Sequence, residues 1–104
     1  MVAVPAQGEI WWAEAGDKRR PVLVVTRSEA VPVLSAIVVA PVTRTLRSIP
    51  TEVVLGEEEG LPVECAASFD NLQRIRRTAL VELIGHLGPR RADICGSLGA
   101  LADC

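Results

Sequence analysis

GEIWWA at positions 8–13 and RPVLVV at positions 20–25 are the two most strand-like stretches of this chain. The second is a continuous, largely β-branched apolar run, which is typical of a strand that is buried on both faces. The turn residues Gly16 and Asp17 lie between the two stretches. We therefore predict that the two stretches pair as an antiparallel hairpin.

The rest of the chain continues this strand-rich pattern. Pro41 lacks the N–H that a strand ladder needs, so pairing is expected to end or bulge there. One helical turn is expected at 77–80, and after Pro89 the apolar residues follow helical spacing. The pattern predicts a mainly β (α+β) barrel or sandwich of about five to seven short strands with a C-terminal helix. The further strands are expected at 36–43, 51–55, 65–69 and 81–87.

Length and composition limit the class of protein. The 104 residues are enough for one domain, 1–104, and too few for the interiors of two. With 49% apolar and 23% charged residues, the composition is that of a globular chain. No apolar run approaches the roughly 20 residues that span a bilayer, and no signal sequence is recognised. Three cysteines without a C-x-x-C pair favour reduced thiols, so we expect a cytoplasmic protein with no membrane partner.

Charge is distributed unevenly along the chain. Six of the seven charged residues in 18–47 are cationic, whereas all five in 52–64 are acidic. Ten of the eleven cationic side chains are arginine, whose planar and permanently charged fork suits phosphate. A local anion-binding face is therefore compatible with the net charge of −2. The alternative is a solvated surface with scattered ion pairs.

Scarce residue types narrow the chemistry that this chain can perform. His86 is the only histidine, which excludes histidine-rich metal sites and paired-histidine acid–base chemistry. Beside Gly85 in an apolar stretch, His86 is expected to be structural. The sequence contains neither a Walker loop nor a G-x-G-x-x-G loop, the two glycine-rich motifs that bind phosphate. Cys65 lies in an apolar stretch, where a buried thiol is usually inert. Any reaction must rely on arginine, hydroxyl and carboxylate side chains, and we expect no metal ion and no cofactor.

Two strand ends carry side chains of these types. Arg20 precedes a proline, which fixes the backbone where the turn enters the second strand. Thr43 and Arg44 place a hydroxyl and a guanidinium at the end of a later strand. If the two strands are neighbours in the barrel, the three side chains converge. The alternative is that Arg20 pairs with Glu9 or Asp17, and that Thr43 caps a turn.

The two opening stretches, GEIWWA and RPVLVV, resemble the opening of the MazF/PemK toxin family. That family begins with a G-[DE]-[IV]-[YW] strand and continues with an R-P-V-L-[IV]-[IV] strand. The resemblance extends over about residues 8–103 of the sequence. Further segments match the family in the right order: APVT at 40–43, IPTEV at 49–53, DNLQRI at 70–75 and ELIGHL at 82–87.

This resemblance implies an SH3-like barrel that forms a homodimer, and a toxin of a toxin–antitoxin pair held inactive by its cognate antitoxin protein. It implies a metal-independent, sequence-specific endoribonuclease that cuts single-stranded RNA. Arg20 matches the family's catalytic arginine and Thr43 its catalytic serine or threonine. The RNA 2′-hydroxyl would attack the adjacent phosphorus and leave a 2′,3′-cyclic phosphate, while a fixed guanidinium stabilises the growing negative charge. Arginine is a poor base, so Glu9 or Asp70 is expected to accept the proton.

The loop between the first two strands, at 14–19, is shorter than the family's usual glycine-rich insertion. Trp12 is expected to offer a stacking face for an unpaired base, the alternative being that one tryptophan of the pair is core and the other surface. The full set of expected RNA-binding residues is Trp12, Lys18, Arg19, Arg44, Asp70, Asn71 and Arg74.

Two other functions use the same kind of barrel. CcdB-type toxins poison DNA gyrase without cutting nucleic acid, and they rely on an aromatic C-terminal end. This chain ends LADC at 101–104, which disfavours the gyrase hypothesis. A non-catalytic SH3-like binding module is the third alternative.

Overall fold

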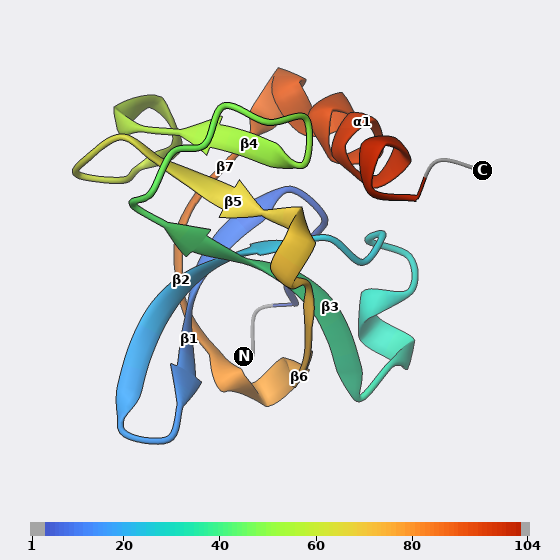
Figure 1. Ribbon diagram of the computed structural model, residues 1–104. Helices are drawn as coiled ribbons and strands as arrows, with labels where there is room; N and C mark the ends of the chain where they lie inside the picture. The colour runs from blue at the N-terminus through green and yellow to red at the C-terminus, as the bar shows by residue number, and fades with distance from the viewer. Residues whose placement is uncertain (1–3, 103–104) are drawn as a thin grey trace.

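The computed structural model describes residues 4–102, which form an antiparallel sheet and one α-helix (Figure 1). The strand order is β4-β5-β3-β2-β1-β7, and β6 pairs with β3 beside this path. The predicted mainly β fold with a C-terminal helix is confirmed. The elements are β1 (Glu9–Ala15), β2 (Lys18–Val24), β3 (Ala36–Thr43), β4 (Glu52–Leu55), β5 (Cys65–Ser68), β6 (Gln73–Arg76), β7 (Leu80–His86) and α1 (Ala92–Leu101).

The predicted hairpin forms the centre of the sheet. β1 and β2 pair in a register that places Ile10 opposite Leu23 and Ala13 opposite Arg20. The second strand begins three residues earlier than its apolar run, at Lys18, because the hairpin continues to pair beyond the buried region. β7 lies on the other side of β1, where two irregularities in the register accommodate the curvature of the sheet.

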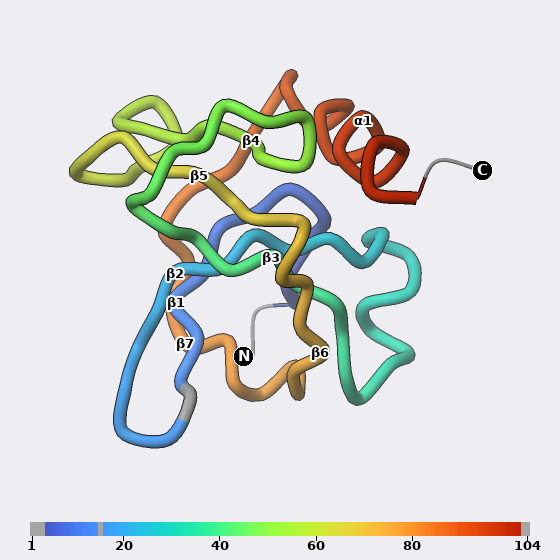
Figure 2. The backbone as a smooth tube through the Cα atoms, in the orientation of Figure 1, coloured from blue at the N-terminus to red at the C-terminus, as the bar shows by residue number. Residues whose placement is uncertain are grey.

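β3 changes its pairing partner around Pro41. On one edge, its first half pairs with β6 as far as Val39, and its second half pairs with β5 from Val42 onward. The ladder with β2 also ends at Pro41, opposite Val22. The predicted end of pairing at this proline is confirmed, and the change of partner curls the sheet, as the backbone trace shows (Figure 2).

Alternating side chains of the central strands build two apolar clusters, one on each side of the sheet. Ile10 and Leu23 join the cluster that contains Phe69 and that α1 covers with Ile94. Their neighbours Trp11 and Val22 join a second cluster on the opposite face. This two-sided burial explains why the stretch at 20–25 is apolar without alternation.

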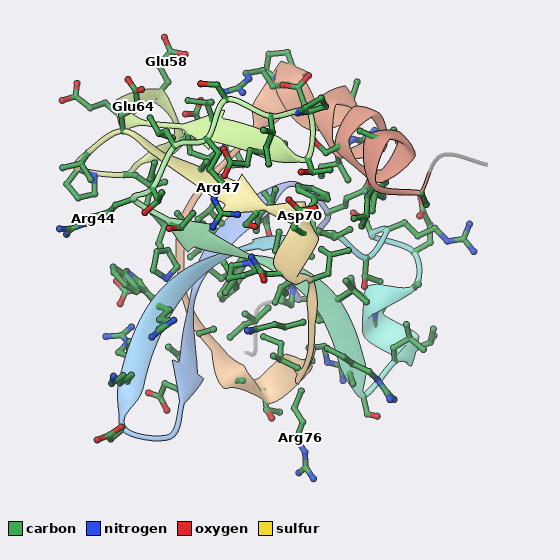
Figure 3. The ribbon with its side chains drawn as sticks, viewed as in Figure 1. Arg44, Arg47, Glu58, Glu64, Asp70 and Arg76 are labelled. Carbon is green, nitrogen blue, oxygen red and sulfur yellow. The ribbon has the colours of Figure 1, made fainter. Side chains whose placement is uncertain are left out.

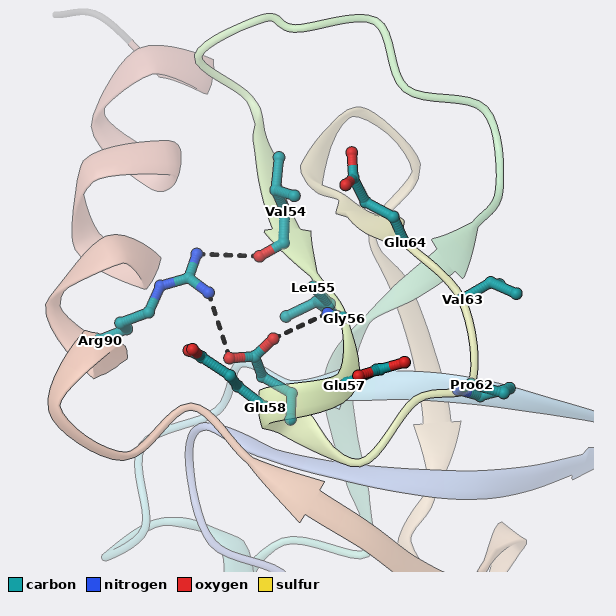
Figure 4. A pocket seen from close by; sticks show the side chains of 10 residues that line it. Val54, Leu55, Gly56, Glu57, Glu58, Pro62, Val63, Glu64 and Arg90 are labelled. Carbon is teal, nitrogen blue, oxygen red and sulfur yellow. Dashed lines mark hydrogen bonds and ion pairs between the residues drawn. The ribbon is translucent and has the colours of Figure 1, made fainter.

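The helix α1 is anchored to β4 and to the turn at 57–59 by one arginine. Arg90 donates hydrogen bonds to the Val54 carbonyl at 2.9 Å and to the Glu59 carboxylate at 3.3 Å (Figure 4). Glu59 is only 6% exposed, and its other oxygen accepts the Gly56 N–H at 2.7 Å. A cavity of about 560 Å³ opens beside this arrangement.

Two details differ from the sequence-based expectation. β6 was not expected as a separate strand, because QRIR contains a single apolar residue. The residues Gly88–Arg91 form a 3-10 turn before the α-helix begins at Ala92. The expected helical turn near 77–80 is present as a 3-10 turn, Arg77–Ala79. Within residues 4–102, no helix has the length and apolar character that crossing a membrane requires.

Candidate functional site

Arg20 and Thr43 both lie near the last pair of the ladder between β2 and β3. The ladder between these strands places Val24 opposite Val39 and Val22 opposite Pro41. The ladder ends at the Val22–Pro41 pair, two residues from Arg20 on β2 and two residues from Thr43 on β3. Because alternate residues of a strand share a face, both side chains lie on the side that carries Val22 and Val24. Residues far apart along the chain are therefore brought to one rim of the sheet.

The two side chains line a common pocket of about 310 Å³. Seven of its nine lining residues are polar, and among them are two guanidinium groups and one carboxylate. The pocket is built by β2, β3, β4, β5 and β6 together with the loop before β4 and the turn between β5 and β6. Its lining residues are Arg20, Pro41, Val42, Thr43, Arg47, Glu52, Ser68, Asn71 and Gln73.

Hydrogen bonds fix several walls of this pocket. The backbone N–H of Arg47 donates to Glu52 Oε1 at 2.9 Å, and Asn71 Nδ2 donates to Ser68 Oγ at 2.9 Å. Thr43 Oγ1 accepts the Thr45 N–H at 3.1 Å, so the hydroxyl does take part in a turn. Its own hydrogen remains available to a ligand, because an oxygen that accepts can also donate.

The Arg20 guanidinium makes no hydrogen bond or ion pair within residues 4–102. The alternative pairing with Glu9 is not formed, because Glu9 Oε1 accepts the Ala6 N–H at 2.7 Å and Trp11 Nε1–H at 3.0 Å. Asp17 also forms no ion pair in the part of the chain that the structure describes. The five N–H donors of Arg20 are therefore free to meet an anion in the pocket.

A second pocket of about 320 Å³ adjoins the first at Val42 and Thr43. Trp12, Pro21 and Val42 contribute to an apolar wall, which continues across Leu61, Pro62, Val63 and Cys65. Arg19 and Arg44 add positive charge to its lining. This arrangement, a ring system with cations beside it, is suited to a flat aromatic group that carries phosphate.

Trp12 is half-buried at this pocket, whereas its neighbour Trp11 is 6% exposed and belongs to the core. The two tryptophans therefore face opposite sides of the sheet. The Arg19 guanidinium carbon lies 5.6 Å from the centre of the Trp12 ring, and Arg19 Nη2 donates to Glu82 at 3.1 Å. This ion pair joins exposed side chains and holds Arg19 beside the ring.

Cys65 lies at the floor of the second pocket and is 3% exposed. Burial raises the pKa of the Cys65 thiol, and the Glu59 carboxylate raises that pKa further. The thiol is therefore held in its neutral form, as expected of an inert cysteine in an apolar stretch.

Three residues expected to bind RNA lie outside both pockets. Lys18 begins β2 at the exposed tip of the hairpin. Arg74 alternates with Gln73 on β6, so the two side chains leave opposite faces and only Gln73 lines the first pocket. Asp70 Oδ2 accepts the Thr51 hydroxyl at 2.7 Å. Asn71, the next residue, does line the first pocket.

Four polar lining residues of the first pocket were not singled out from the sequence as site residues: Arg47, Glu52, Ser68 and Gln73. Figure 3 shows the Arg47 side chain directed over the sheet, whereas Arg44 points outward at the edge and Arg76 points away from it. Glu52 lies in the matched segment IPTEV, but its sequence neighbours do not reveal that β4 joins the wall. Within residues 4–102, no group of His, Cys, Asp and Glu side chains is arranged to hold a metal ion.

Comparison with known proteins bears on the family and the fold of this chain. Probable endoribonuclease MazF5 of Mycobacterium tuberculosis is 38% identical over 107 residues, covering 100% of this chain and 98% of that protein. The solved toxin MazF-mt6 of Mycobacterium tuberculosis is 35% identical with a TM-score of 0.83, covering 91% of this chain and 96% of that one.

A mycobacterial endoribonuclease solved in complex with its cognate antitoxin has the same fold. It has a TM-score of 0.79 at 24% identity, over 92% of each chain. A family model described as PemK-like, MazF-like toxin of type II toxin–antitoxin system matches residues 6–97. With this match over most of its length, the chain belongs to the PemK-like and MazF-like toxin family.

Proposed function

We propose that this toxin is an endoribonuclease that cuts single-stranded RNA in the pocket between Arg20 and Thr43. The observation that carries the proposal is the pairing of an unengaged guanidinium with a hydroxyl in one polar pocket of about 310 Å³. Family membership and the 38% identity to a protein named a probable endoribonuclease support the reaction class.

RNA brings its own nucleophile to such a site. The 2′-hydroxyl attacks the adjacent phosphorus, and negative charge grows on the phosphate oxygens in the transition state. The Arg20 guanidinium is suited to stabilise that charge with two parallel N–H donors, and Arg47 adds a second cation in the same pocket. The Thr43 hydroxyl positions the phosphate. The products are a 2′,3′-cyclic phosphate and a 5′-hydroxyl, and no metal-bound water is required.

The second pocket is suited to a base next to the reacting phosphate. An unpaired base can lie against Trp12 and the apolar wall, where stacking contributes about 1–3 kcal/mol per base. Arg19 and Arg44 are placed to neutralise neighbouring phosphates. Bases paired in a helix are not free to enter such a pocket, so we expect a preference for single strands. The cleavage sequence would follow from which bases fit this wall.

The partners follow from the same surface. We propose that a flexible acidic segment of the cognate antitoxin lies across the arginine-lined pockets and excludes RNA. We also propose a homodimer in the cytoplasm, with one domain, 1–104, in each copy. Exposed apolar side chains such as Val81 (42% exposed) and Leu83 (48% exposed) supply surface for contacts between copies.

The proposal is tested by incubating the protein with total RNA in EDTA and mapping new 5′ ends. We expect discrete cleavage sites with 5′-hydroxyl ends that persist in EDTA. The absence of new ends would contradict the proposal, and inhibition of gyrase supercoiling in the same preparation would support a gyrase poison instead. The variant Thr43→Ala should abolish cleavage and relieve growth arrest, whereas Thr43→Ser, which keeps the hydroxyl, should retain activity.

A further inference from the structure

The proposed reaction needs a group that takes the proton from the 2′-hydroxyl. Arginine cannot supply it, because the guanidinium keeps its proton in proteins. The only histidine, His86, stands opposite Glu9 in the ladder between β7 and β1. Glu9 begins β1, whereas Arg20 stands opposite Ala13 near the other end of that strand, so His86 is not close to Arg20. The proton acceptor must therefore be a carboxylate close to Arg20.

Glu9 and Asp70, the two carboxylates expected from the sequence, are poorly placed for this role. Glu9 Oε1 binds two N–H donors, at Ala6 and Trp11, and Glu9 lines neither site pocket. Asp70 accepts the Thr51 hydroxyl at 2.7 Å and also lies outside the lining of both pockets. Each carboxylate has a structural role that does not involve the rim of β2 and β3.

From these observations we infer that Glu52 is the proton acceptor, an inference that rests on the proposed ribonuclease function. Among the nine residues that line the pocket with Arg20 and Thr43, Glu52 is the one carboxylate. It begins β4, where it stands opposite Ser68 of β5. The preceding residue of β5, Ala67, stands opposite Val42, so Glu52, Ser68 and Pro41 form one row across three strands. Two strand spacings make this row about 10 Å wide, which leaves room for a ribose phosphate.

The carboxylate is held without being fully used. Glu52 Oε1 accepts a hydrogen bond from the backbone N–H of Arg47 at 2.9 Å, which fixes the carboxylate at the start of β4. Its Oε2 accepts no hydrogen bond from any residue in 4–102. A carboxylate oxygen with free lone pairs is what a proton acceptor needs.

Charged groups from several elements surround Glu52. Arg20 of β2 and Arg47 of the preceding loop line the same pocket. On the other side of β4, Arg90 and Asp93 share a cavity with Glu52. Asp70, which follows β5, accepts a hydrogen bond from the hydroxyl of Thr51, the residue before Glu52. Arg20 and Arg47 therefore place positive charge beside Glu52 in the pocket that would hold the phosphate.

The step balances with water as the only other participant. The 2′-oxygen forms a bond to phosphorus and gives its proton to the Glu52 carboxylate. The bond between phosphorus and the 5′-oxygen breaks, its electron pair stays on that oxygen, and the oxygen takes a proton from water. Glu52 then releases its proton to solvent, so the enzyme returns to its starting state.

The test is the variant Glu52→Gln. It keeps a side-chain oxygen that can accept the hydrogen bond from the backbone N–H of Arg47, and it removes the basic carboxylate. On an RNA oligonucleotide with a mapped site, we expect the single-turnover rate to fall by about 10²–10⁴-fold. The wild-type rate should rise with pH as a carboxyl group loses its proton, and the variant should lack this rise. Affinity for the same oligonucleotide with 2′-deoxyribose at the cleavage site should not change. Glu58→Gln makes the same chemical change on the exposed acidic loop and should cleave at the wild-type rate.

Three results would overturn the inference. One is a Glu52→Gln rate within about threefold of wild type, and another is a slow variant that keeps the rise with pH. The third is a rise that disappears in Asp70→Asn instead. If Glu52→Gln does not fold, Glu52→Asp decides the matter, since a retained carboxylate must retain the rise with pH. Failure of the wild-type protein to cut any RNA would instead contradict the proposed function itself.

Discussion

Two arginines of this chain, Arg90 and Arg20, differ in how fully their donors are used. Arg90 binds Glu59 at 3.3 Å, Asp93 at 3.2 Å and the Val54 carbonyl at 2.9 Å. Arg20 has no such partner in residues 4–102 and lines a polar pocket. A guanidinium that donates from each of its three nitrogens holds the fold together, whereas one left unengaged at a pocket can bind an incoming anion.

The carboxylates beside them differ in the same way. Glu59 is 6% exposed and both its oxygens accept hydrogen bonds, from Gly56 and from Arg90. Glu52 is half-buried, and one of its oxygens accepts no hydrogen bond in the described part of the chain. The region around Arg90 therefore resembles a closed structural joint, and the region around Arg20 an open site. Mutations in the first should cost stability, and mutations in the second should cost activity.

The largest expected effect is on catalysis in Arg20→Ala. Loss of a donor aimed at developing charge costs about 10²–10³-fold in rate, which corresponds to about 3–4 kcal/mol. Because Arg20 makes no hydrogen bond or ion pair within residues 4–102, the free energy of unfolding should change by less than about 0.5 kcal/mol. Single-turnover cleavage of an RNA oligonucleotide and urea unfolding measure the two quantities.

Arg20→Lys separates charge from geometry in the same assays. Lysine keeps the positive charge but lacks the planar fork, so it should recover only part of the lost rate. Full activity in Arg20→Ala would show that the open site is not where the reaction occurs. A large loss of stability in Arg20→Ala would show that this arginine is structural after all.

Arg90→Met should have the opposite profile. It keeps most of the apolar stem but leaves the buried Glu59 carboxylate without its cation, which should cost about 2–3 kcal/mol of stability. Arg90 is 37% exposed, so we expect a smaller loss than for a fully buried pair. Urea unfolding measures the change, and the folded variant should cleave RNA at close to the wild-type rate. The double variant with Glu59→Gln should recover part of the stability, because no unpaired buried charge then remains.

The strands were predictable where burial alone determines the sequence. The segment 36–43 was expected with the bounds that β3 has, because its β-branched residues serve both apolar clusters. β6 could not be recognised in the same way. Its residues Gln73, Arg74 and Arg76 are exposed, and it is a strand only because the edge of β3 before Pro41 needs a partner. Such pairing is a tertiary effect that local sequence does not encode.

The site was predictable in part for a similar reason. Their places at strand ends and the family resemblance both pointed to Arg20 and Thr43, and the two side chains line one pocket. Arg47 and Glu52 were not identified, because they reach the pocket only through the order β4-β5-β3. Strand order depends on contacts between distant segments, so the spacing of residues in the sequence does not predict that Arg47 and Glu52 line the same pocket as Arg20.

A third prediction sharpens the view of the Arg90 region as a closed joint. A Cβ added at Gly85 would overlap the Glu59 backbone carbonyl, which is fixed by the turn at 57–59. Gly85→Ala should therefore destabilise the fold by about 1–3 kcal/mol through overpacking. Val33→Ala, which shortens a side chain that is 79% exposed, is the control and should change stability little. Thermal unfolding of both variants measures this, and equal stability of Gly85→Ala and wild type would mean that the turn and β7 separate easily.

The smallest effect concerns the walls of the open site, where Cys65 reports on their rigidity. Burial raises the pKa of this thiol, so at a given pH it holds less reactive thiolate than an exposed cysteine. In a Cys104→Ser background, iodoacetamide should therefore label Cys65 at least about tenfold more slowly than the exposed Cys95. Raising the pH should increase labelling of Cys65, because burial raises the pKa of this thiol and a higher pH is needed to form its thiolate. Equal rates, measured by mass spectrometry of peptides, would mean that the second pocket opens to its floor, and that the apolar wall beside Trp12 is too mobile to select a base.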